Sequence, residues 1–540
     1  MDPVRRPGPP TRSDERHART GAQPFVVACA CTLAALAARS AAQDQPTPEA
    51  FKGLADIVVP TERGADRRLD LTLAAALRLA RANNTSIQIA ELRPLQVLEQ
   101  LRQAQAFFEP EAFTDLGYRR SKSVSQGAFS PPTERETFDA RLGWRQRAIT
   151  GGLFEMALAP VKFVQKQNAF FGRNDVSLWT SDLTFTYSQP LLRGGWTQVT
   201  LTEVRSAELS HAASAGAFER SVQDTLLAVV RAYWELSYAR ENFRAVFAAR
   251  ELALEQLRIT EERIRVRQLA ERDRVTDEAE VAQRAEQLIA AENEVYARAD
   301  ALRRLLLQDS EGELWTTDLV PSTAIEGPLF SADLDWRVPS REALRRRPDL
   351  KQLQADVSLA EVRQEAAKNE LLPQLDFVGS YAATGADNNF NSALGNIFDF
   401  EAYDWSVRLQ LTLPIGNSGA RALLAQRRLE TEQALRTMYA KEMDVVQEVR
   451  DAVRALRTTA ERVRASQESV RLAETELDTA QKRFRAGELT PFDVRLRNQS
   501  LLDARTRLLR NLVDHRIAQA QLLYTQGLLG VPEGEDLTEK

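Results

Sequence analysis

The sequence predicts an α+β membrane protein in which long helices that pack as coiled coils alternate with strands of an outer-membrane β-barrel. Three observations support this fold class: two long stretches without glycine or proline, several short segments of alternating apolar and polar residues, and an internal duplication of the whole pattern. The chain has 540 residues, which is more than one ordinary compact domain of roughly 100–200 residues needs.

The composition excludes several classes of protein. Lys and Arg (71) nearly balance Asp and Glu (76), so no basic surface for nucleic acid is expected. No apolar run of about 18 residues follows the N-terminal region, which argues against a helical multispan membrane protein. With three His and four Met, no Gly-rich phosphate loop and no catalytic constellation, we expect no metal site, no cofactor and no enzyme.

Residues 1–42 read as a signal peptide, and residues 43–68 as an N-terminal extension. Arginines precede an apolar run at 24–38, and small residues lead to a cleavage site near Ala42, the order that secretory signals have. The run is too short to span a bilayer. Acidic residues in the long basic region leave open a start codon further downstream.

Both cysteines of the chain, Cys29 and Cys31, lie inside this segment. The mature chain would therefore have no disulfide and no thiol chemistry. The stretch Val26–Cys29 also resembles a lipoprotein box, which would make Cys29 a lipid-bearing N-terminus. Against lipidation, the apolar residues continue past Cys29, whereas a lipobox ends its apolar run.

Strands are predicted where apolar and polar residues alternate, at 138–145, 183–188, 374–381 and 403–413. Strands of about ten residues with one apolar face are the units of outer-membrane barrels. At about 3.3 Å per residue and a tilt of about 40°, residues 403–413 would cover roughly 28 Å, close to an apolar band of about 25 Å. A soluble antiparallel sheet gives the same alternation; aromatic residues near the strand ends and the signal peptide favour the membrane.

Long helices are predicted at Ala217–Glu311 and Arg421–Ala486, which lack glycine and proline and are rich in helix-forming residues. In the second stretch apolar residues recur with 3-4 spacing, which is typical of coiled-coil packing. The seam positions are 446, 449, 453, 456, 460, 463, 470, 477 and 484, with polar interruptions at Gln467, Glu474 and Gln481. A helix of this length would extend about 100 Å.

The chain contains an internal duplication. The pattern Arg-x-Arg-x-x-x-Leu-x-x-x-Asp occurs at 263–273 and again at 483–493. We therefore expect two repeats of helix, strands and a long helix pair, at 69–308 and 341–529, joined by a Pro-containing linker at 309–340 and followed by a polar tail at 530–540. Because such a unit cannot close a barrel alone, a symmetric ring of subunits is implied.

Several separated motifs resemble the outer-membrane efflux protein family, the TolC-like channel-tunnels. They are Gln189-Pro190-Leu191-Leu192-Arg193-Gly194, Arg347-Pro348-Asp349-Leu350, Leu371–Leu375, Trp405–Pro414 and Arg483–Val494. The resemblance implies a homotrimer, with a β-barrel in outer-membrane lipid continuous with a long α-helical barrel in the periplasm. It implies a passive exit duct that docks onto a periplasmic adaptor (membrane fusion) protein and an inner-membrane pump of the RND, ABC or MFS type.

The resemblance also points to candidate functional residues at two helix reversals, 264–273 and 484–493, which look like the family's periplasmic tips. These residues are Arg267, Asp273, Phe484, Gly487, Leu489, Thr490 and Asp493. Threefold repetition would set rings of carboxylates around the pore, and such rings favour cations. Alternatively, Thr490 and Asp493 form a capping box, Gly487 is a helix C′ residue, and Asp273 belongs to a solvated helix face.

Two departures from the family pattern affect these expectations. The first reversal has Arg267 where the second has Gly487, so we expect it to turn differently or to present extra positive charge. An additional hairpin is predicted near 137–165, around Gly151 and Gly152. It extends the barrel or forms an outside loop.

Three functions remain open at this point. The chain is the exit duct of a small-molecule exporter, the outer-membrane partner of a type I protein secretion system, or a periplasmic coiled-coil scaffold or adaptor without a pore. The scaffold would explain the heptads but not the alternating strands that end at Pro190 and Pro414. The sequence does not identify a substrate.

Overall fold

A computed structural model describes residues 67–123, 133–169, 172–306, 313–327 and 334–530. The expected signal peptide with Cys29, the N-terminal extension before Arg67 and the tail after Gly530 lie outside the described residues.

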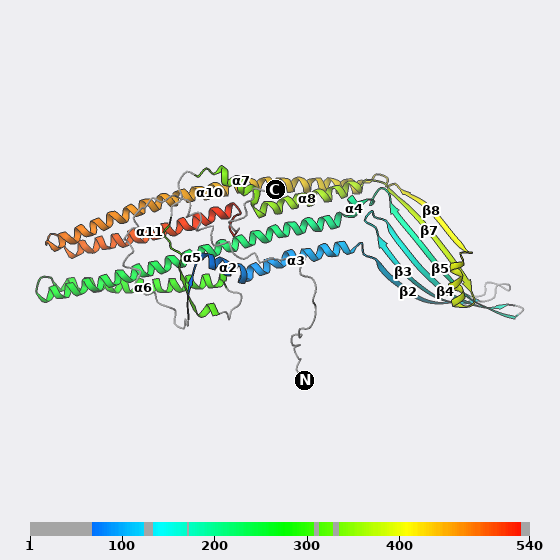
Figure 1. Ribbon diagram of the computed structural model, residues 1–540, viewed down its shortest axis with the longest axis horizontal. Coiled ribbons are helices and arrows are strands. Elements are labelled where there is room, and N and C mark those ends of the chain that lie inside the picture. The colour runs from blue at the N-terminus through cyan, green and yellow to red at the C-terminus, as the bar shows by residue number, and fades with distance from the viewer. Residues whose placement is uncertain (1–66, 124–132, 170–171, 307–312, 328–333, 531–540) are drawn as a thin grey trace, which may run out of the picture. The chain divides into compact units, whose positions relative to one another are not determined.

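The helices and strands fall into two groups along the chain, each with short helices, strands of the large sheet and a long helix pair (Figure 1). The first half contains β1 (Arg67–Leu71), α2 (Leu73–Asn83), α3 (Thr85–Ala106), β2 (Glu111–Lys122), β3 (Thr133–Arg147), β4 (Leu153–Ala169), β5 (Gly172–Pro190), α4 (Thr197–Thr200), α5 (Thr202–Arg265) and α6 (Glu271–Leu306). The second contains η2 (Glu313–Thr316), β6 (Thr317–Pro321), α7 (Arg337–Arg346), α8 (Pro348–Asn369), β7 (Gln374–Asp387), α9 (Phe390–Gly395), η3 (Asn396–Asp399), β8 (Tyr403–Thr412), α10 (Ser418–Arg485) and α11 (Pro491–Thr525).

The six-stranded antiparallel sheet joins both halves of the sequence in the order β2-β3-β4-β5-β7-β8. Each strand expected from the alternation is present. The additional hairpin is β3–β4, which pairs with β2 on one side and β5 on the other, so it extends the sheet instead of forming an outside loop. The halves meet where β5 pairs with β7, from Trp179 opposite Asp387 to Pro190 opposite Asp376.

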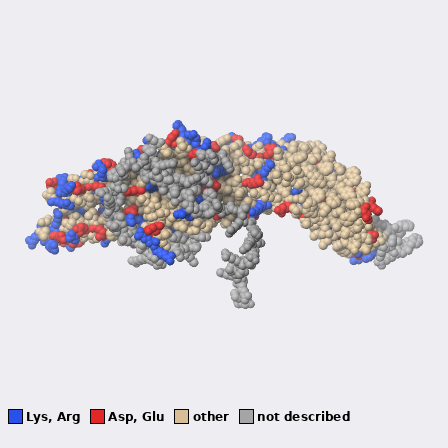
Figure 2. Space-filling view, in the orientation of Figure 1, with Lys and Arg blue, Asp and Glu red and all other residues tan. Residues whose placement is uncertain are grey.

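The two faces of this sheet differ in chemistry. Leu183 and Phe185 of β5 lie opposite Ala383 and Tyr381 of β7 on one face. On the other face, the Thr384 hydroxyl donates to Asp182 (2.7 Å). Figure 2 shows charged side chains over the helices, whereas the visible part of the sheet carries few until its far end. The sheet therefore has one apolar and one polar face, as the period of two predicted.

The long helices pack side by side as two antiparallel pairs, α5 with α6 and α10 with α11 (Figure 1). The expected heptad seam is confirmed in α10, where Val463 and Val470 are buried against Leu501 and Leu508 of α11. Removing each such side chain from water contributes about 1.5–3 kcal/mol. Among the described residues, no helix combines the length and the apolar character that crossing a membrane requires.

β1 and β6 form a small parallel sheet. This sheet packs against α5 and holds the segment around β6 in place. The Tyr233 hydroxyl of α5 donates to the Leu71 carbonyl (2.9 Å) and accepts from the Thr323 amide (3.0 Å). The buried Arg240 guanidinium donates to Asp318 of β6 (2.9 Å). Because an uncompensated buried charge is costly, this pair fixes β6 against α5.

Candidate functional site

The two helix reversals have the same backbone structure. At the first, the amides of Arg267 and Gln268 donate to the carbonyls of Ile264 and Arg263 (both 2.8 Å). At the second, the amides of Gly487 and Glu488 donate to the carbonyls of Phe484 (3.0 Å) and Arg483 (2.9 Å). This is the Schellman pattern, which satisfies the last carbonyls of a helix.

Arg267 adopts the left-handed conformation that the pattern requires. Its φ is +59°, and φ at Gly487 is +81°. The first reversal therefore has the same turn as the second, so of the two alternatives expected for Arg267 the different turn is wrong. The hydrogen bonds that end α5 hold Arg267 in a conformation that glycine adopts at lower cost. Arg267 is exposed, so its positive charge lies on the surface of the tip.

Asp493 caps the start of α11. The Thr490 amide donates to the Asp493 carboxylate (2.9 Å), and the Asp493 amide donates to the Thr490 hydroxyl oxygen (3.4 Å). This is the capping box expected from the sequence. The hydrogen bonds from the Thr490 hydroxyl and amide lower the pKa of Asp493, so the carboxylate stays ionised at neutral pH.

Asp273 has half of the same arrangement. The Ala270 amide donates to its carboxylate (3.2 Å), while Ala270 has no hydroxyl to return the bond. The Asp273 side chain is 43% exposed, as expected for a solvated helix face, and it also satisfies an amide at the start of α6. The sequence did not indicate this contact, because position 270 is alanine and a capping box needs a hydroxyl residue there.

The two reversals contact each other. The Arg263 guanidinium lies 4.5 Å from the centre of the Phe484 ring, a cation–π distance. Further along, Arg495 of α11 pairs with Asp277 of α6, whose side chain is 4% exposed. Sequence reasoning missed this ion pair, because nothing local relates residues 218 positions apart.

Leu489 is half-buried and Thr490 is exposed beside it.

A groove with a cavity of about 160 Å³ lies between α5, α6 and α11, and the Arg495–Asp277 pair forms part of its lining. Its α5 side is lined by small and apolar residues, Ala245, Ala248, Ala249, Leu252 and Ala253. Its opposite side carries Arg284, Arg495 and Arg505.

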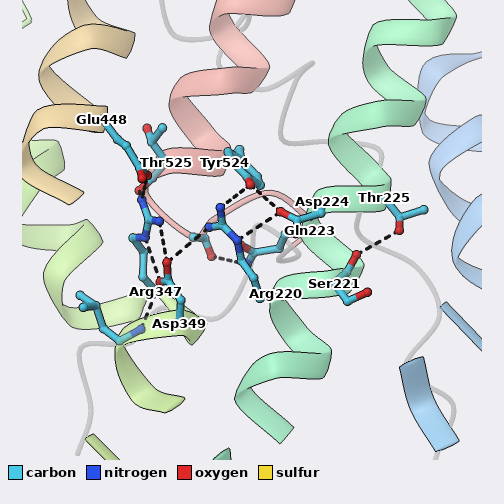
Figure 3. Close-up of polar contacts among 12 residues, drawn as sticks. Arg220, Ser221, Gln223, Asp224, Thr225, Arg347, Asp349, Glu448, Tyr524 and Thr525 are labelled. Carbon is cyan, nitrogen blue, oxygen red and sulfur yellow. Dashed lines mark hydrogen bonds and ion pairs between the residues drawn. The ribbon is translucent and has the colours of Figure 1, made fainter. Parts of the chain in front are cut away.

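Far from the tips, a polar cluster ties four helices together (Figure 3). Arg347, which is 0% exposed, donates two hydrogen bonds to Asp349 (3.0 and 2.7 Å) and one to Glu448 of α10 (2.5 Å). Burial alone raises the pKa of Asp349, but the hydrogen bonds and charge of Arg347 outweigh it and lower that pKa to about 2. Thr525 at the end of α11 adds its carbonyl oxygen (3.4 Å).

The cluster continues onto α5. The Arg220 guanidinium stacks on Tyr524 of α11 (4.3 Å to the ring centre) and donates to its hydroxyl, which in turn donates to Asp224. Burial, together with Asp224, raises the pKa of Tyr524 to about 12. The low pKa of Asp349 and the high pKa of Tyr524 keep the first ionised and the second protonated at neutral pH, which suits a permanent structural tie.

Comparison with known proteins shows which family and which solved structures this chain resembles. Residues 340–527 match the family described as Outer membrane efflux protein. The fold resembles the outer membrane channel CmeC of Campylobacter jejuni, at 18% identity and a TM-score of 0.61, over 85% of this chain and 86% of that one.

Two further structures show the same fold. The outer membrane protein VceC of Vibrio cholerae matches at 16% identity and a TM-score of 0.60, over 84% of this chain and 96% of that one. The MtrE outer membrane channel of Neisseria gonorrhoeae, in its open state, matches at 17% identity and a TM-score of 0.57, over 91% of this chain and 98% of that one. No curated protein matches the sequence.

Proposed function

From the premise that residues 340–527 form an outer membrane efflux protein domain, we propose that this chain is the outer-membrane exit duct of a tripartite efflux or type I secretion system. The observation that carries the proposal is the six-stranded sheet, with one apolar face, attached to helix pairs whose reversals carry Asp273 and Asp493. Such a duct lies in the outer membrane, with its helices in the periplasm. It passes substrates without chemistry, so the chain is not an enzyme.

The sheet supports assembly into a homotrimer. Among the described residues of one chain the sheet ends at β2 and β8, whose outer edges have no partner strand, and open edges are not tolerated in lipid. Three six-stranded sheets joined β2 to β8 would close a barrel of eighteen strands, an even number as bacterial barrels require. The extra hairpin β3–β4 would then widen the barrel relative to members with two strands in each half.

The repeats at 69–308 and 341–529 would place their tips together at the periplasmic end, with 309–340 as the equatorial segment. Asp273 and Asp493, repeated three times, would line the narrow end with ionised carboxylates, which favour cations. Arg267, Phe484, Gly487, Leu489 and Thr490 would shape the surface onto which the adaptor docks. The inner-membrane pump would supply the energy.

Ionic current through the purified protein in a planar lipid bilayer tests this proposal. The variant Asp273→Asn, Asp493→Asn removes both charges, while each amide oxygen still accepts the capping hydrogen bond. We expect discrete cation-selective steps in the wild type and lower cation selectivity in the variant. The matched control is Glu261→Gln, Asp478→Asn, which removes two exposed charges from the sides of α5 and α10.

Each result has a distinct meaning. Equal selectivity in the tip variant and the control would remove the gating role and leave the aspartates as helix caps. Folded wild-type protein that gives no current would contradict the duct and favour the periplasmic scaffold.

A further inference from the structure

A short insertion between β7 and β8 folds back onto the apolar face of the sheet. We name residues 390–400, which contain α9 and η3, the flap. A Cβ atom on Gly385 would lie 2.1 Å from the Ala393 carbonyl oxygen, so the flap sits directly over Gly385 and requires glycine there. Gly385 lies opposite Ser181. Cross-strand partners share a face, and this is the face of Leu183 and Tyr381.

Apolar packing and one amide hold the flap in place. Its residues Ala393 and Ile397 are buried, as are Ser181 and Ala383 of the strands beneath. The Asn396 side-chain amide donates to the Ala386 carbonyl (3.2 Å). The flap therefore has a fixed position on the sheet and a defined outer side.

That outer side presents large aromatic residues to the surroundings. Phe398 is 65% exposed and Phe400 is 52% exposed. Phe400 also has a φ of +51°, which costs about 1–2 kcal/mol in an L-residue. Phe400 ends η3 in this conformation, and its side chain is only half covered by the chain.

The flap lies at the level where the apolar face of the sheet ends. Tyr403, the first residue of β8, lies opposite Ala383, and Phe390 of the flap contacts Trp179 of β5 (5.0 Å between ring centres). The exposed acids Asp399 and Glu401 flank Phe400, which excludes the hydrocarbon centre. Aromatic rings beside charged groups are typical of the boundary between lipid headgroups and acyl chains.

We propose that the flap is an interfacial anchor that inserts Phe398 and Phe400 into the headgroup–acyl boundary of outer-membrane lipid. This rests on the proposed function, because that function places the apolar face of the sheet in lipid. The flap would add a lipid contact beside the strands and would fix the depth at which the sheet sits.

Spin labels on single cysteines test the anchor in the full-length protein reconstituted into vesicles of phosphatidylethanolamine and phosphatidylglycerol. Cys29 and Cys31, the only cysteines in the sequence, lie in the expected signal peptide, so the exported protein accepts a label only at the cysteine that is introduced. Labels are placed by Phe398→Cys and Phe400→Cys in the flap, Leu409→Cys on the apolar face, and Glu261→Cys on α5. The measurement is the collision rate of each label with oxygen, which enters lipid, and with a water-soluble nickel chelate.

We expect the labels at 398 and 400 to collide more often with oxygen than with the nickel chelate. The excess of oxygen collisions should be larger for the label at 409, and the label at 261 should collide more often with the nickel chelate. Nickel-dominated collisions at 398 and 400 beside an oxygen-dominated 409 would overturn the anchor and leave the duct intact. Protection from both reagents would overturn it as well, because the flap would then contact another subunit. Nickel-dominated collisions at 409 would contradict the membrane location of the sheet, and with it the proposed function.

Discussion

At the scale of single residues, Arg267 and Gly487 occupy equivalent positions with different intrinsic preferences. Both have positive φ, which an L-residue adopts at a cost of about 1–2 kcal/mol. Nothing crowds Gly487, since no atom lies within 4 Å of an added Cβ. Backbone strain is therefore the main difference between the two reversals.

Exchanging these residue types should change the local stability of the tips in opposite directions. We expect Arg267→Gly to stabilise the first reversal by about 1 kcal/mol and Gly487→Ala to destabilise the second by a similar amount. Hydrogen exchange followed by mass spectrometry should show amides of 264–273 exchanging roughly fivefold more slowly and those of 484–493 roughly fivefold faster. The control Gln268→Gly, where φ is not positive, should only accelerate exchange. Slower exchange there too would contradict the strain.

His515 is the residue whose buried state makes stability depend on pH. Its Nδ1 lies 3.1 Å from the Thr459 hydroxyl, and its Nε2 lies 3.0 Å from the Gln519 amide nitrogen. Burial, with the nearby charge of Arg516, lowers the pKa of His515 from 6.5 to about 4. His515 is 2% exposed, so it belongs to the packed interior between α10 and α11.

The sign of the pH effect follows from this shift. Between pH 6.5 and 4 the unfolded chain binds a proton that the folded chain does not, so stability falls as the pH falls, by up to about 3 kcal/mol. Thermal unfolding at pH 7.5 and 4.5 should show a smaller loss at low pH for His515→Gln than for the wild type. His211→Gln is the control, since His211 is only half-buried. An unchanged loss in His515→Gln would assign the pH effect to other groups.

At the scale of elements, the Arg347 cluster holds the end of α11 against the junction between α7 and α8 and against the middle of α10. The resemblance to the family rests partly on the motif Arg347–Leu350, and the structure supplies a physical reason for it. Arg347 supplies donors to two carboxylates and one carbonyl at once, a geometry that suits the planar guanidinium and not an ammonium.

Removing this arginine should loosen the helix ends that it joins. Arg347→Met removes the buried partner of Asp349 and Glu448, while Lys441 stays 3.4 and 3.5 Å from these carboxylates. We therefore expect a loss of about 3 kcal/mol, the lower end for a broken buried pair. Thermal unfolding should show the loss, and amides of 519–530 should exchange faster. The control Arg346→Met removes a partly exposed pair with Glu342 (2.9 Å) and should cost less than about 1 kcal/mol. Equal losses would contradict the tie.

At the scale of the whole molecule, two kinds of element divide the work of the proposed duct. Strands from both halves combine in one sheet with one apolar and one polar face. The long helices pair within each half, and helices of the two halves also contact each other, at the reversals and at the Arg347 cluster. If three chains assemble as proposed, channel activity would belong to the assembly and not to one chain.

The sequence alone determined the order of elements, the strand faces, the heptad seam and the capping box at Asp493. These are set by residues close together in the chain, whose periodicity and side-chain chemistry act locally. The sequence also located both reversals through their repeat.

Only the tertiary structure decided the rest. It showed that β3–β4 lies inside the sheet, that Arg267 turns as glycine does, that Asp277 meets Arg495, and that the flap covers Gly385. These contacts join residues far apart in the chain or oppose a local preference. The packing free energy of the complete fold decides them, and no local pattern records that energy.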